Sequence, residues 1–211
     1  MSRAAVRHLS TDPELGALIR RVGPPKLGVE RDRGPYEALV RAIAHQQLHG
    51  NAARAILARF EALFPQGGFP APESVLAAPE EALRGCGFSA TKIASIRDIC
   101  AHAARGAVPT RRAAARLSDE ALIERLTAIR GVGRWTVEMM LIFTLGRPDV
   151  MPADDYGVRE GFRILRGLDA QPKPKALLEL TRHWSPWRSV GAWYMYRAVE
   201  EARAQAPRSR A

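Results

Sequence analysis

The chain has 211 residues, of which 46% are hydrophobic, which is enough apolar material for one sizeable core or two small helical ones. Its 32 Lys and Arg outnumber its 22 Asp and Glu, and the net charge of +10 favours a polyanionic partner, most often nucleic acid. No apolar run is long enough to span a bilayer, and two cysteines are too few for a disulfide framework or a four-thiolate iron–sulfur cluster.

Apolar residues recur at helical intervals along several segments, and no segment alternates as a strand would. Residues 36–48 place on one face Tyr36, Leu39, Val40 and Ile43. Residues 51–64 do the same with Ala53, Ile56, Leu57, Phe60, Leu63 and Phe64. Residues 118–129 begin with Ser118 as the expected N-cap, followed by acidic residues in the first turn. The pattern predicts an all-α protein.

The segment AHQQLHGN, residues 44–51, carries His45 and His49 at the spacing of a zinc-protease helix. That chemistry requires a glutamate directly after the first histidine, and Gln46 stands there instead. A zinc site is therefore disfavoured, and a helix–helix turn around Gly50 is one alternative.

A glycine turn also precedes Ser89 and Lys92 in the segment LRGCGFSATK. The two side chains could contact a phosphate, or the turn could simply connect two helices. The residues alone leave both interpretations open.

The segment LTAIRGVGRWTVEMML, residues 126–141, predicts two helices joined by a turn at Gly131 and Gly133. Glycines at these positions leave N–H groups uncovered at the start of the second helix, where partial positive charge favours a phosphate. Arg130 and Arg134 flank the turn, and Thr136 offers a hydroxyl donor. A connection without any ligand is the alternative.

Two adjacent carboxylates, Asp154 and Asp155, precede a predicted helix that begins with DYGVREGFRIL. Aspartate is among the preferred N-cap residues, so capping explains the pair without any chemistry. Adjacent residues at a helix start point in different directions, which allows one to cap while the other faces a binding site. Which of the two roles applies to each aspartate depends on what the chain binds.

These segments together resemble the 3-methyladenine DNA glycosylase II branch of the helix-hairpin-helix DNA glycosylase superfamily. The resemblance rests on the hairpin, on GRP and MPADDY after it, on AIAHQQLHGNAA before it and on HWSPWRSVGAWYMYR near the end. It covers roughly residues 35–200, and 21 residues separate Gly133 from Asp155.

The resemblance implies two helical lobes, formed by about residues 1–35 with 155–211 and by about residues 36–154, with DNA bound in a cleft between them. Larger bacterial members carry an additional N-terminal β domain. Only about 35 residues precede the match here, so the compact form is expected.

The resemblance also implies that Asp155 is the catalytic residue and Asp154 the N-cap or supporting carboxylate. The implied reaction is release of alkylated purines such as 3-methyladenine and 7-methylguanine from double-stranded DNA in base excision repair, leaving an abasic site. Members that also cut the backbone use a lysine where this chain has Trp135, and an indole cannot form a Schiff base. A glycosylase without lyase activity is therefore expected.

Base flipping requires a pocket that holds the extruded base, and aromatic rings stack well on a cationic purine. The expected pocket residues are Trp135, Tyr196, Met139 and Tyr156, with Met139 standing where the branch can carry a tyrosine. Core packing is the preferred role for Trp184, Trp187 and Trp193.

The residues expected at the DNA include Gln47 or Leu48 filling the gap left by the flipped base, with His49 nearby. The hairpin contributes Arg130, Gly131, Val132, Gly133, Arg134 and Thr136. A monovalent cation held by the backbone carbonyls of Thr127, Ile129 and Val132 is the only bound ion implied, and no catalytic cofactor is expected.

A monomer located in the cytoplasm, at the nucleoid if the source is bacterial, is expected. One alternative is a helix-hairpin-helix protein that binds DNA without chemistry, and release of free base separates the two. Another is a bifunctional oxidised-base glycosylase, which Trp135 disfavours because it supplies no amine.

Overall fold

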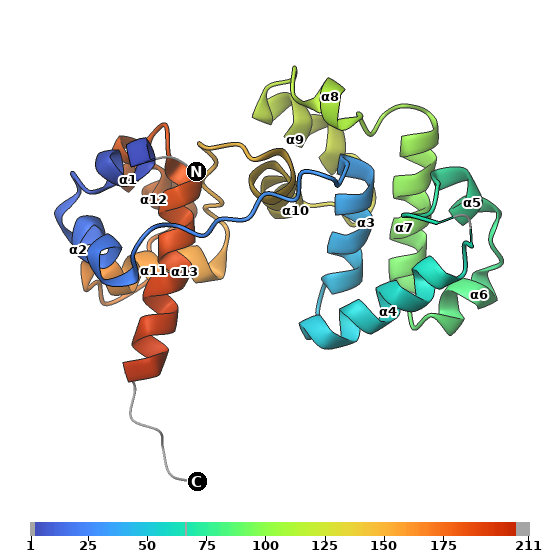
Figure 1. The fold of residues 1–211 in the computed structure, drawn as a ribbon, viewed down its shortest axis with the longest axis horizontal. Helices are drawn as coiled ribbons and strands as arrows, with labels where there is room; N and C mark the ends of the chain where they lie inside the picture. Colours follow the sequence, from blue (N-terminus) through green and yellow to red (C-terminus); the bar gives the residue numbers. More distant parts are fainter. Residues whose placement is uncertain (1–2, 66, 206–211) are drawn as a thin grey trace, which may run out of the picture. The chain divides into compact units, whose positions relative to one another are not determined.

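The computed structural model describes residues 3–65 and 67–205, in which every regular element is a helix and no strand occurs (Figure 1). The prediction of an all-α fold is confirmed. The chain forms two compact units, one from residues 1–29 with 146–211 and one from residues 30–145. We call them the terminal unit and the central unit. In the described residues no helix has both the length and the apolar character needed to cross a membrane.

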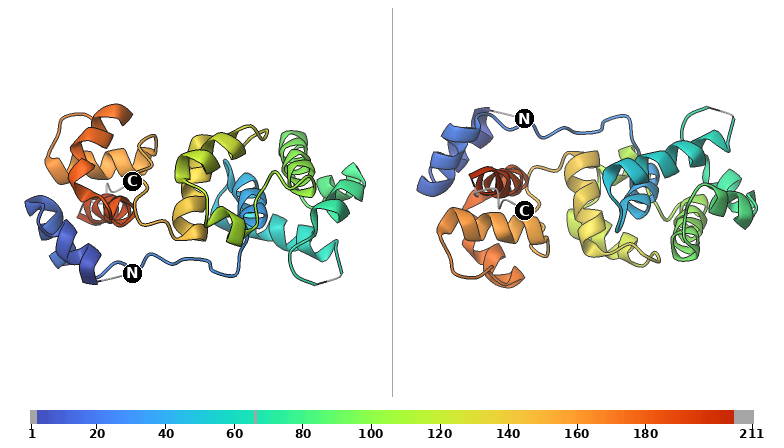
Figure 2. Two further views of the ribbon diagram at one scale, coloured as in Figure 1. Left: turned by 90° about the horizontal axis from the view of Figure 1, so that it is seen from above. Right: turned by 90° about the horizontal axis from the view of Figure 1, so that it is seen from below.

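The helices of the terminal unit come from both ends of the chain. They are α1 (Arg3–Leu9), α2 (Pro13–Val22), α11 (Tyr156–Arg166), α12 (Pro174–Leu180), η2 (Arg182–Trp184) and α13 (Arg188–Gln205). Helix α2 packs against both α11 and α13, which run beside each other (Figures 1 and 2).

The core of the terminal unit depends on a close approach of α11 to α13. A Cβ atom on Gly161 would lie 2.1 Å from the backbone oxygen of Met195, so no side chain fits there. Trp184 is buried in this core at 1% exposure, and Trp187 and Trp193 pack against it. The core role predicted for the three tryptophans is confirmed.

The central unit is a continuous stretch of chain. Its helices are α3 (Pro35–His45), α4 (Gly50–Ala62), α5 (Pro72–Ala77), α6 (Glu80–Gly85), α7 (Ala90–Ala104), α8 (Arg111–Ala114), α9 (Asp119–Thr127), α10 (Arg134–Met139) and the π-helix η1 (Met140–Leu145). Helix α3 packs against α4 and α7 and also against α10 and η1 (Figure 1).

Two predicted helices of the central unit end earlier than their apolar pattern suggests. The helix predicted over 36–48 ends at His45, because Gln47 adopts a left-handed backbone with φ of 57°. Leu63, predicted on the buried face, is 40% exposed because α4 ends at Ala62. The predicted N-cap at Ser118 is confirmed, since its hydroxyl accepts the N–H of Ala121.

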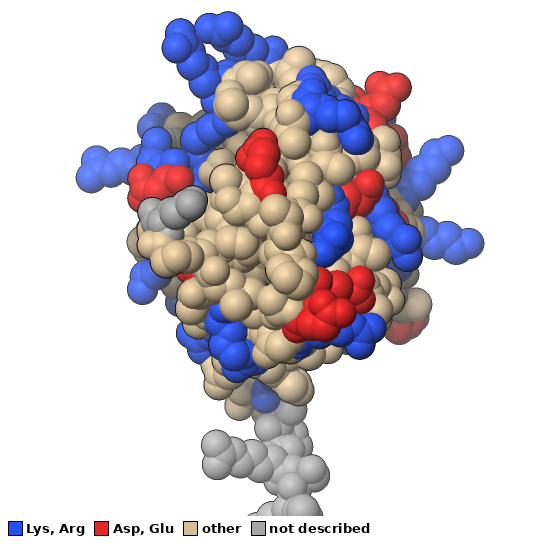
Figure 3. Space-filling model, turned by 90° about the vertical axis from the view of Figure 1, so that its right-hand side faces the viewer, with Lys and Arg blue, Asp and Glu red and all other residues tan. Residues whose placement is uncertain are grey.

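The face that carries α5 and α6 does not collect the excess positive charge. Figure 3 shows Lys and Arg on this side interspersed with Asp and Glu around uncharged surface. Arg84 and Glu80 on α6 form one such pair at 3.2 Å. A polyanion-binding surface is therefore better sought elsewhere in the chain.

Asp12 joins the first two helices to the rest of the terminal unit. Its Oδ1 caps α2 by accepting the N–H of Leu15, and its Oδ2 accepts hydrogen bonds from Trp184 and His183 at 2.8 Å each and from Arg166. Burial alone would raise the pKa of Asp12, but these donors outweigh it and lower the pKa from 3.8 to about 2.

We expect Asp12→Asn to lower the free energy of unfolding by about 2 kcal/mol near neutral pH. The folded chain holds the proton less readily than the unfolded chain, so the stabilisation is present above pH 3.8 and is lost as the pH falls toward 2. Urea unfolding of both proteins between about pH 7 and about pH 3 measures the difference. Glu14→Gln, which removes an exposed partner of the same Arg166, is the control and should change little. A difference that stays constant with pH would contradict the assignment.

Candidate functional site

Loop 46–49 connects α3 to α4 and projects polar and apolar side chains from the central unit. Gln47, Leu48 and His49 are all exposed, as their predicted contacts with DNA require. The side-chain Nε2 of Gln46 donates to the carbonyl of Gly131 at 3.2 Å. The loop is therefore tied to the hairpin turn that the sequence places 85 residues away.

The hairpin has the predicted form, with α9 and α10 joined by a turn at residues 128–133. Gly131 has φ of 77°, and a Cβ atom on it would lie 2.5 Å from the Oγ of Ser95 on α7. The N–H of Arg130 donates to the carboxylate of Asp98, also on α7, at 2.8 Å. Gly133 has φ of −91° and open space around it, and it lies at the N-cap of α10.

Two hairpin side chains that were predicted to contact phosphate, those of Arg134 and Thr136, have other surroundings in the structure. Arg134 is already engaged by Glu120 at 2.8 Å and Glu138 at 3.0 Å, and the hydrogen bond with Glu120 raises its pKa. Thr136, the third residue of α10, is 4% exposed and lines an internal pocket, because this position faces inward. Arg130 is exposed. The backbone N–H groups are therefore better candidates for phosphate binding than these two side chains.

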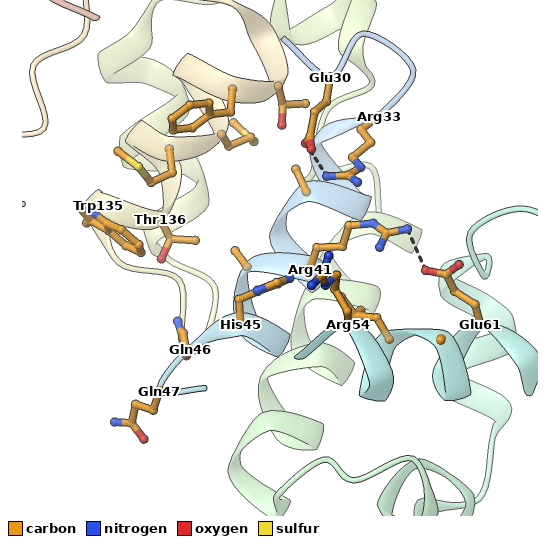
Figure 4. A pocket seen from close by; sticks show the side chains of 18 residues that line it. Glu30, Arg33, Arg41, His45, Gln46, Gln47, Arg54, Glu61, Trp135 and Thr136 are labelled. Carbon is orange, nitrogen blue, oxygen red and sulfur yellow. Dashed lines mark hydrogen bonds and ion pairs between the residues drawn. The ribbon is translucent and has the colours of Figure 1, made fainter. Parts of the chain in front are cut away.

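The central unit contains a pocket of about 940 Å³ between α3, α4, α10 and η1 (Figure 4). Trp135 and Met139, both predicted to hold the base, line it together with Gln47 from loop 46–49. Trp135 is 43% exposed, so its ring is accessible for stacking. The pocket brings together residues that are distant in sequence and that were predicted separately.

One side of this pocket carries basic residues, two of which, Arg33 and Arg41, are paired with Glu30 and Glu61. Burial lowers the pKa of the His45 imidazole, and the positive charges of Arg41, Lys92, Arg33 and Arg54 lower it further. Arg41 and Glu61 are 2.8 Å apart (Figure 4). No described residues form a group of three His, Cys, Asp or Glu suited to a metal.

Asp155 begins α11 in the terminal unit, and its carboxylate is held at both oxygens. Oδ1 accepts the N–H of Val158 at 2.9 Å, and Oδ2 accepts the hydroxyl of Tyr196 at 2.8 Å. Asp155 is 8% exposed. Burial raises the pKa of Tyr196, and the neighbouring charge of Asp155 raises it further, so the phenol remains a proton donor to the carboxylate.

The predicted division of labour between the two aspartates is wrong in one respect. Asp154 was expected to be the N-cap or a supporting carboxylate, and the N-cap is instead Asp155, because α11 begins at Tyr156 and the oxygen of Asp155 reaches Val158. Asp154 is exposed. The capping and catalytic interpretations therefore fall on the same residue.

Tyr196 and Tyr156 differ in what they can contact. Tyr156 is 65% exposed, whereas Tyr196 is partly buried and holds Asp155 through its hydroxyl. The Tyr196 ring lies against Gly157, where a Cβ atom would come within 2.8 Å of it. This hydrogen bond was not predicted from the sequence, in which the glycine after DDY is the available signal.

The predicted cation site at Thr127, Ile129 and Val132 stays a prediction. The carbonyl of Ile129 accepts the N–H of Val132 at 3.1 Å, which closes the turn. The Thr127 hydroxyl donates to the carbonyl of Ile123 at 2.8 Å.

Known proteins share this sequence and this fold. Residues 40–186 match the HhH-GPD family, whose members are base excision DNA repair proteins of the HhH-GPD superfamily. The chain is similar to DNA-3-methyladenine glycosylase 1 of Schizosaccharomyces pombe, with 43% identity over 96% of this chain and 89% of that protein. It is also 35% identical to an alkylbase DNA glycosidase-like protein of the same species, over 92% of each chain.

Two solved structures resemble the chain over most of its length. One is a 3-methyladenine DNA glycosylase of Schizosaccharomyces pombe in complex with abasic DNA, with a TM-score of 0.82, 45% identity, and coverage of 92% of this chain and 95% of that one. The other is a DNA-3-methyladenine glycosidase of Bacillus halodurans, with a TM-score of 0.86, 32% identity, and coverage of 97% and 92%.

The two hairpin glycines should respond differently to alanine. We expect Gly131→Ala to lower the free energy of unfolding by about 2–3 kcal/mol, since it puts a Cβ on a left-handed backbone and against Ser95. Gly133→Ala should change it by less than about 0.5 kcal/mol, because its backbone is ordinary and its surroundings are open. Urea unfolding of both variants measures this, and equal losses would contradict the described turn.

Proposed function

The chain belongs to the HhH-GPD superfamily of base excision DNA repair proteins, and we propose that it is a DNA glycosylase that releases alkylated purines, of the 3-methyladenine and 7-methylguanine type, from DNA. The observation that carries the proposal is the similarity to a 3-methyladenine glycosylase over 96% of the chain. Asp155 supports it, because this nearly buried carboxylate is held at both oxygens.

The proposed reaction asks for one well-placed negative charge. An alkyl group at N3 or N7 makes a purine cationic, so its bond to the sugar is already weakened and the base leaves with little protonation. The remaining task is to stabilise the positive charge that develops on the sugar and to admit water. We assign both to Asp155, whose carboxylate is fixed in advance by Val158 and Tyr196. One acid then suffices where glycoside hydrolases generally use two.

DNA binding is assigned to backbone and loop rather than to a row of arginines. The N–H groups at the start of α10 meet phosphates, and the exposed Arg130 adds a charge. Gln47 or Leu48 fills the gap left by an extruded base, and Trp135 with Met139 forms a wall for that base. Met139 is smaller than the tyrosine that the branch can carry at this position, and it has no hydroxyl group.

No lyase step is part of the proposal. Trp135 occupies the hairpin position at which a lysine amine would attack the sugar, and an indole has no such nucleophile. The product is then a free base and an abasic site. No borohydride-trapped adduct between protein and DNA is expected.

A second candidate is a DNA-binding protein without chemistry. It is favoured by one observation, the hydrogen bond from Val158 to Asp155, because capping alone accounts for an aspartate at this position. The test must therefore keep the cap and remove the charge.

Location, assembly and ions complete the proposal. We propose a monomer in the cytoplasm, where thiols stay reduced; Cys86 and Cys100 are both free and buried. The reaction as written uses water and DNA alone. A monovalent cation at the hairpin carbonyls would be a structural addition.

Asp155→Asn is the decisive variant, since asparagine caps helices as well as aspartate does. We expect base release from methylated duplex DNA to fall by about 100-fold or more, because the charge that stabilises the sugar cation is gone. DNA affinity should be unchanged or higher, because a negative charge near a polyanion has been removed. Chromatography of the released bases measures the first, and fluorescence anisotropy the second.

Asp154→Asn is the matched control, because it removes the same charge from the exposed neighbour and should release base at the parental rate. An Asp155→Asn variant that still releases base at the parental rate would reduce the residue to a cap. A parent protein that releases no alkylated base would support the second candidate.

Tyr196→Phe should slow base release by about tenfold or more, because a hydrogen bond to a charged group is worth about 1.5–3 kcal/mol. The ring remains, so any stacking is retained. Tyr194→Phe is the control on the same helix, since its hydroxyl binds the carbonyl of Gly23 at 2.9 Å in the core. It should affect stability and leave the single-turnover rate alone. Equal rates for the two variants would remove Tyr196 from the site.

A further inference from the structure

The backbone of loop 46–49 adopts an unfavourable conformation that neighbouring groups must stabilise. Gln47 is the one non-glycine residue with positive φ in the described part of the chain, at 57°. A residue with a side chain costs about 1–2 kcal/mol in this left-handed region, so such a conformation persists only where neighbours impose it. The Gln47 and Leu48 side chains are themselves exposed, so the constraint is better sought in groups that bind the loop backbone.

Lys92 supplies that constraint from α7. Its Nζ donates to the carbonyls of Ala44 and Gln46 at 2.8 Å each. These carbonyls lie at the C-terminal end of α3, where the helix leaves oxygens unpaired and the backbone carries partial negative charge. The ammonium thus fixes the peptide groups that follow Ala44 and Gln46, and the second of these leads directly into the left-handed Gln47. Burial lowers the pKa of Lys92, as expected for an amine drawn away from solvent.

The same face of α7 also holds the hairpin. Ser95 lies against Gly131, and Asp98 accepts the N–H of Arg130. Lys92, Ser95 and Asp98 follow one another at intervals of three, which places them along one side of a helix. One helix therefore supports both loops to which DNA contacts are assigned.

We infer that Lys92 is a positioning residue for base extrusion, one that sets the backbone of loop 46–49 so that Gln47 and Leu48 enter the duplex, without itself binding phosphate. Two of its three donors are used inside the protein. The inference rests on the proposed function, because extrusion of a base is the event that the loop serves.

The first test does not depend on activity. Lys92→Met keeps the length of the side chain and removes its donors. We expect the amides of Gln46 and Leu48, which donate to Ala42 and His45, to exchange with deuterium about tenfold faster, while the amide of Val132 in the hairpin keeps its protection. Arg105→Met removes one exposed positive charge from the end of α7 and serves as the control with unchanged loop exchange.

The second test separates extrusion from binding. With a methylated purine paired normally, single-turnover base release by Lys92→Met should fall by about tenfold. With the same purine opposite an abasic site, where little pairing must be broken, the loss should shrink to about twofold. DNA affinity and its salt dependence should change no more than in Arg105→Met.

The third test asks whether Lys92 acts through the loop. In a chain that already carries Gln47→Ala and Leu48→Ala, adding Lys92→Met should slow release by less than about twofold, since residues acting in series are not additive. Lys92→Arg keeps donors for both carbonyls and should restore most of the loop protection and most of the rate.

Several results would overturn the inference. Loop amides that exchange at the parental rate in Lys92→Met would show that the lysine does not set the backbone. An equal loss of rate on both substrates, accompanied by a weaker salt dependence, would make Lys92 a phosphate contact. If the parent released no base at all, the proposed function would fail, while the exchange experiment would still decide whether Lys92 holds the loop.

Discussion

The carboxylate of Asp155 is the constraint around which the terminal unit is organised. One oxygen completes the first turn of α11 and the other accepts the hydroxyl of Tyr196 on α13. A carboxylate fixed from two sides needs little reorganisation when a cation forms beside it, and this is the main source of electrostatic catalysis in enzymes. The same hydrogen bonds also make the residue structural, so the helix cap and the proposed catalytic group are one side chain.

The central unit has a different role in the proposed function, which is to present backbone N–H groups to a polyanion. Its hairpin turn and its loop 46–49 are both short, and side chains of α7 hydrogen-bond to the backbone of both. Glu120 and Glu138 both form ion pairs with Arg134, so this arginine of the hairpin is already paired within the protein. Charge count alone therefore overstates how many arginines are free for a partner.

Much of the fold was predictable because apolar spacing and N-caps are local signals. The helices and the hairpin glycines follow from them, as does the cap at Ser118. The identity of the capping aspartate did not follow, because two adjacent carboxylates satisfy the same rule and only the start of α11 at Tyr156 decides between them. The bond from Tyr196 to Asp155 spans 41 residues and depends on how two helices pack.

The contacts of Lys92 and Thr136 could not be predicted from the sequence for a similar reason. A lysine after a glycine turn is compatible with phosphate or with a helix end, and only the carbonyls of Ala44 and Gln46 distinguish them. Thr136 lies one residue beyond an exposed tryptophan, yet the turn of α10 carries it inward. Long-range partners decide such cases.

The glycine at position 161 has a consequence for how this molecule can vary. Because α11 meets the main chain of α13 there, the spacing between the two helices is set by backbone atoms rather than by interchangeable side chains. That spacing in turn sets the distance between the two oxygens that meet at Asp155 and Tyr196. A residue about two helical turns from Asp155, with no side chain of its own, therefore fixes the helix spacing on which the Asp155–Tyr196 hydrogen bond depends. Substitution is excluded at this position, whereas the outer faces of both helices can vary.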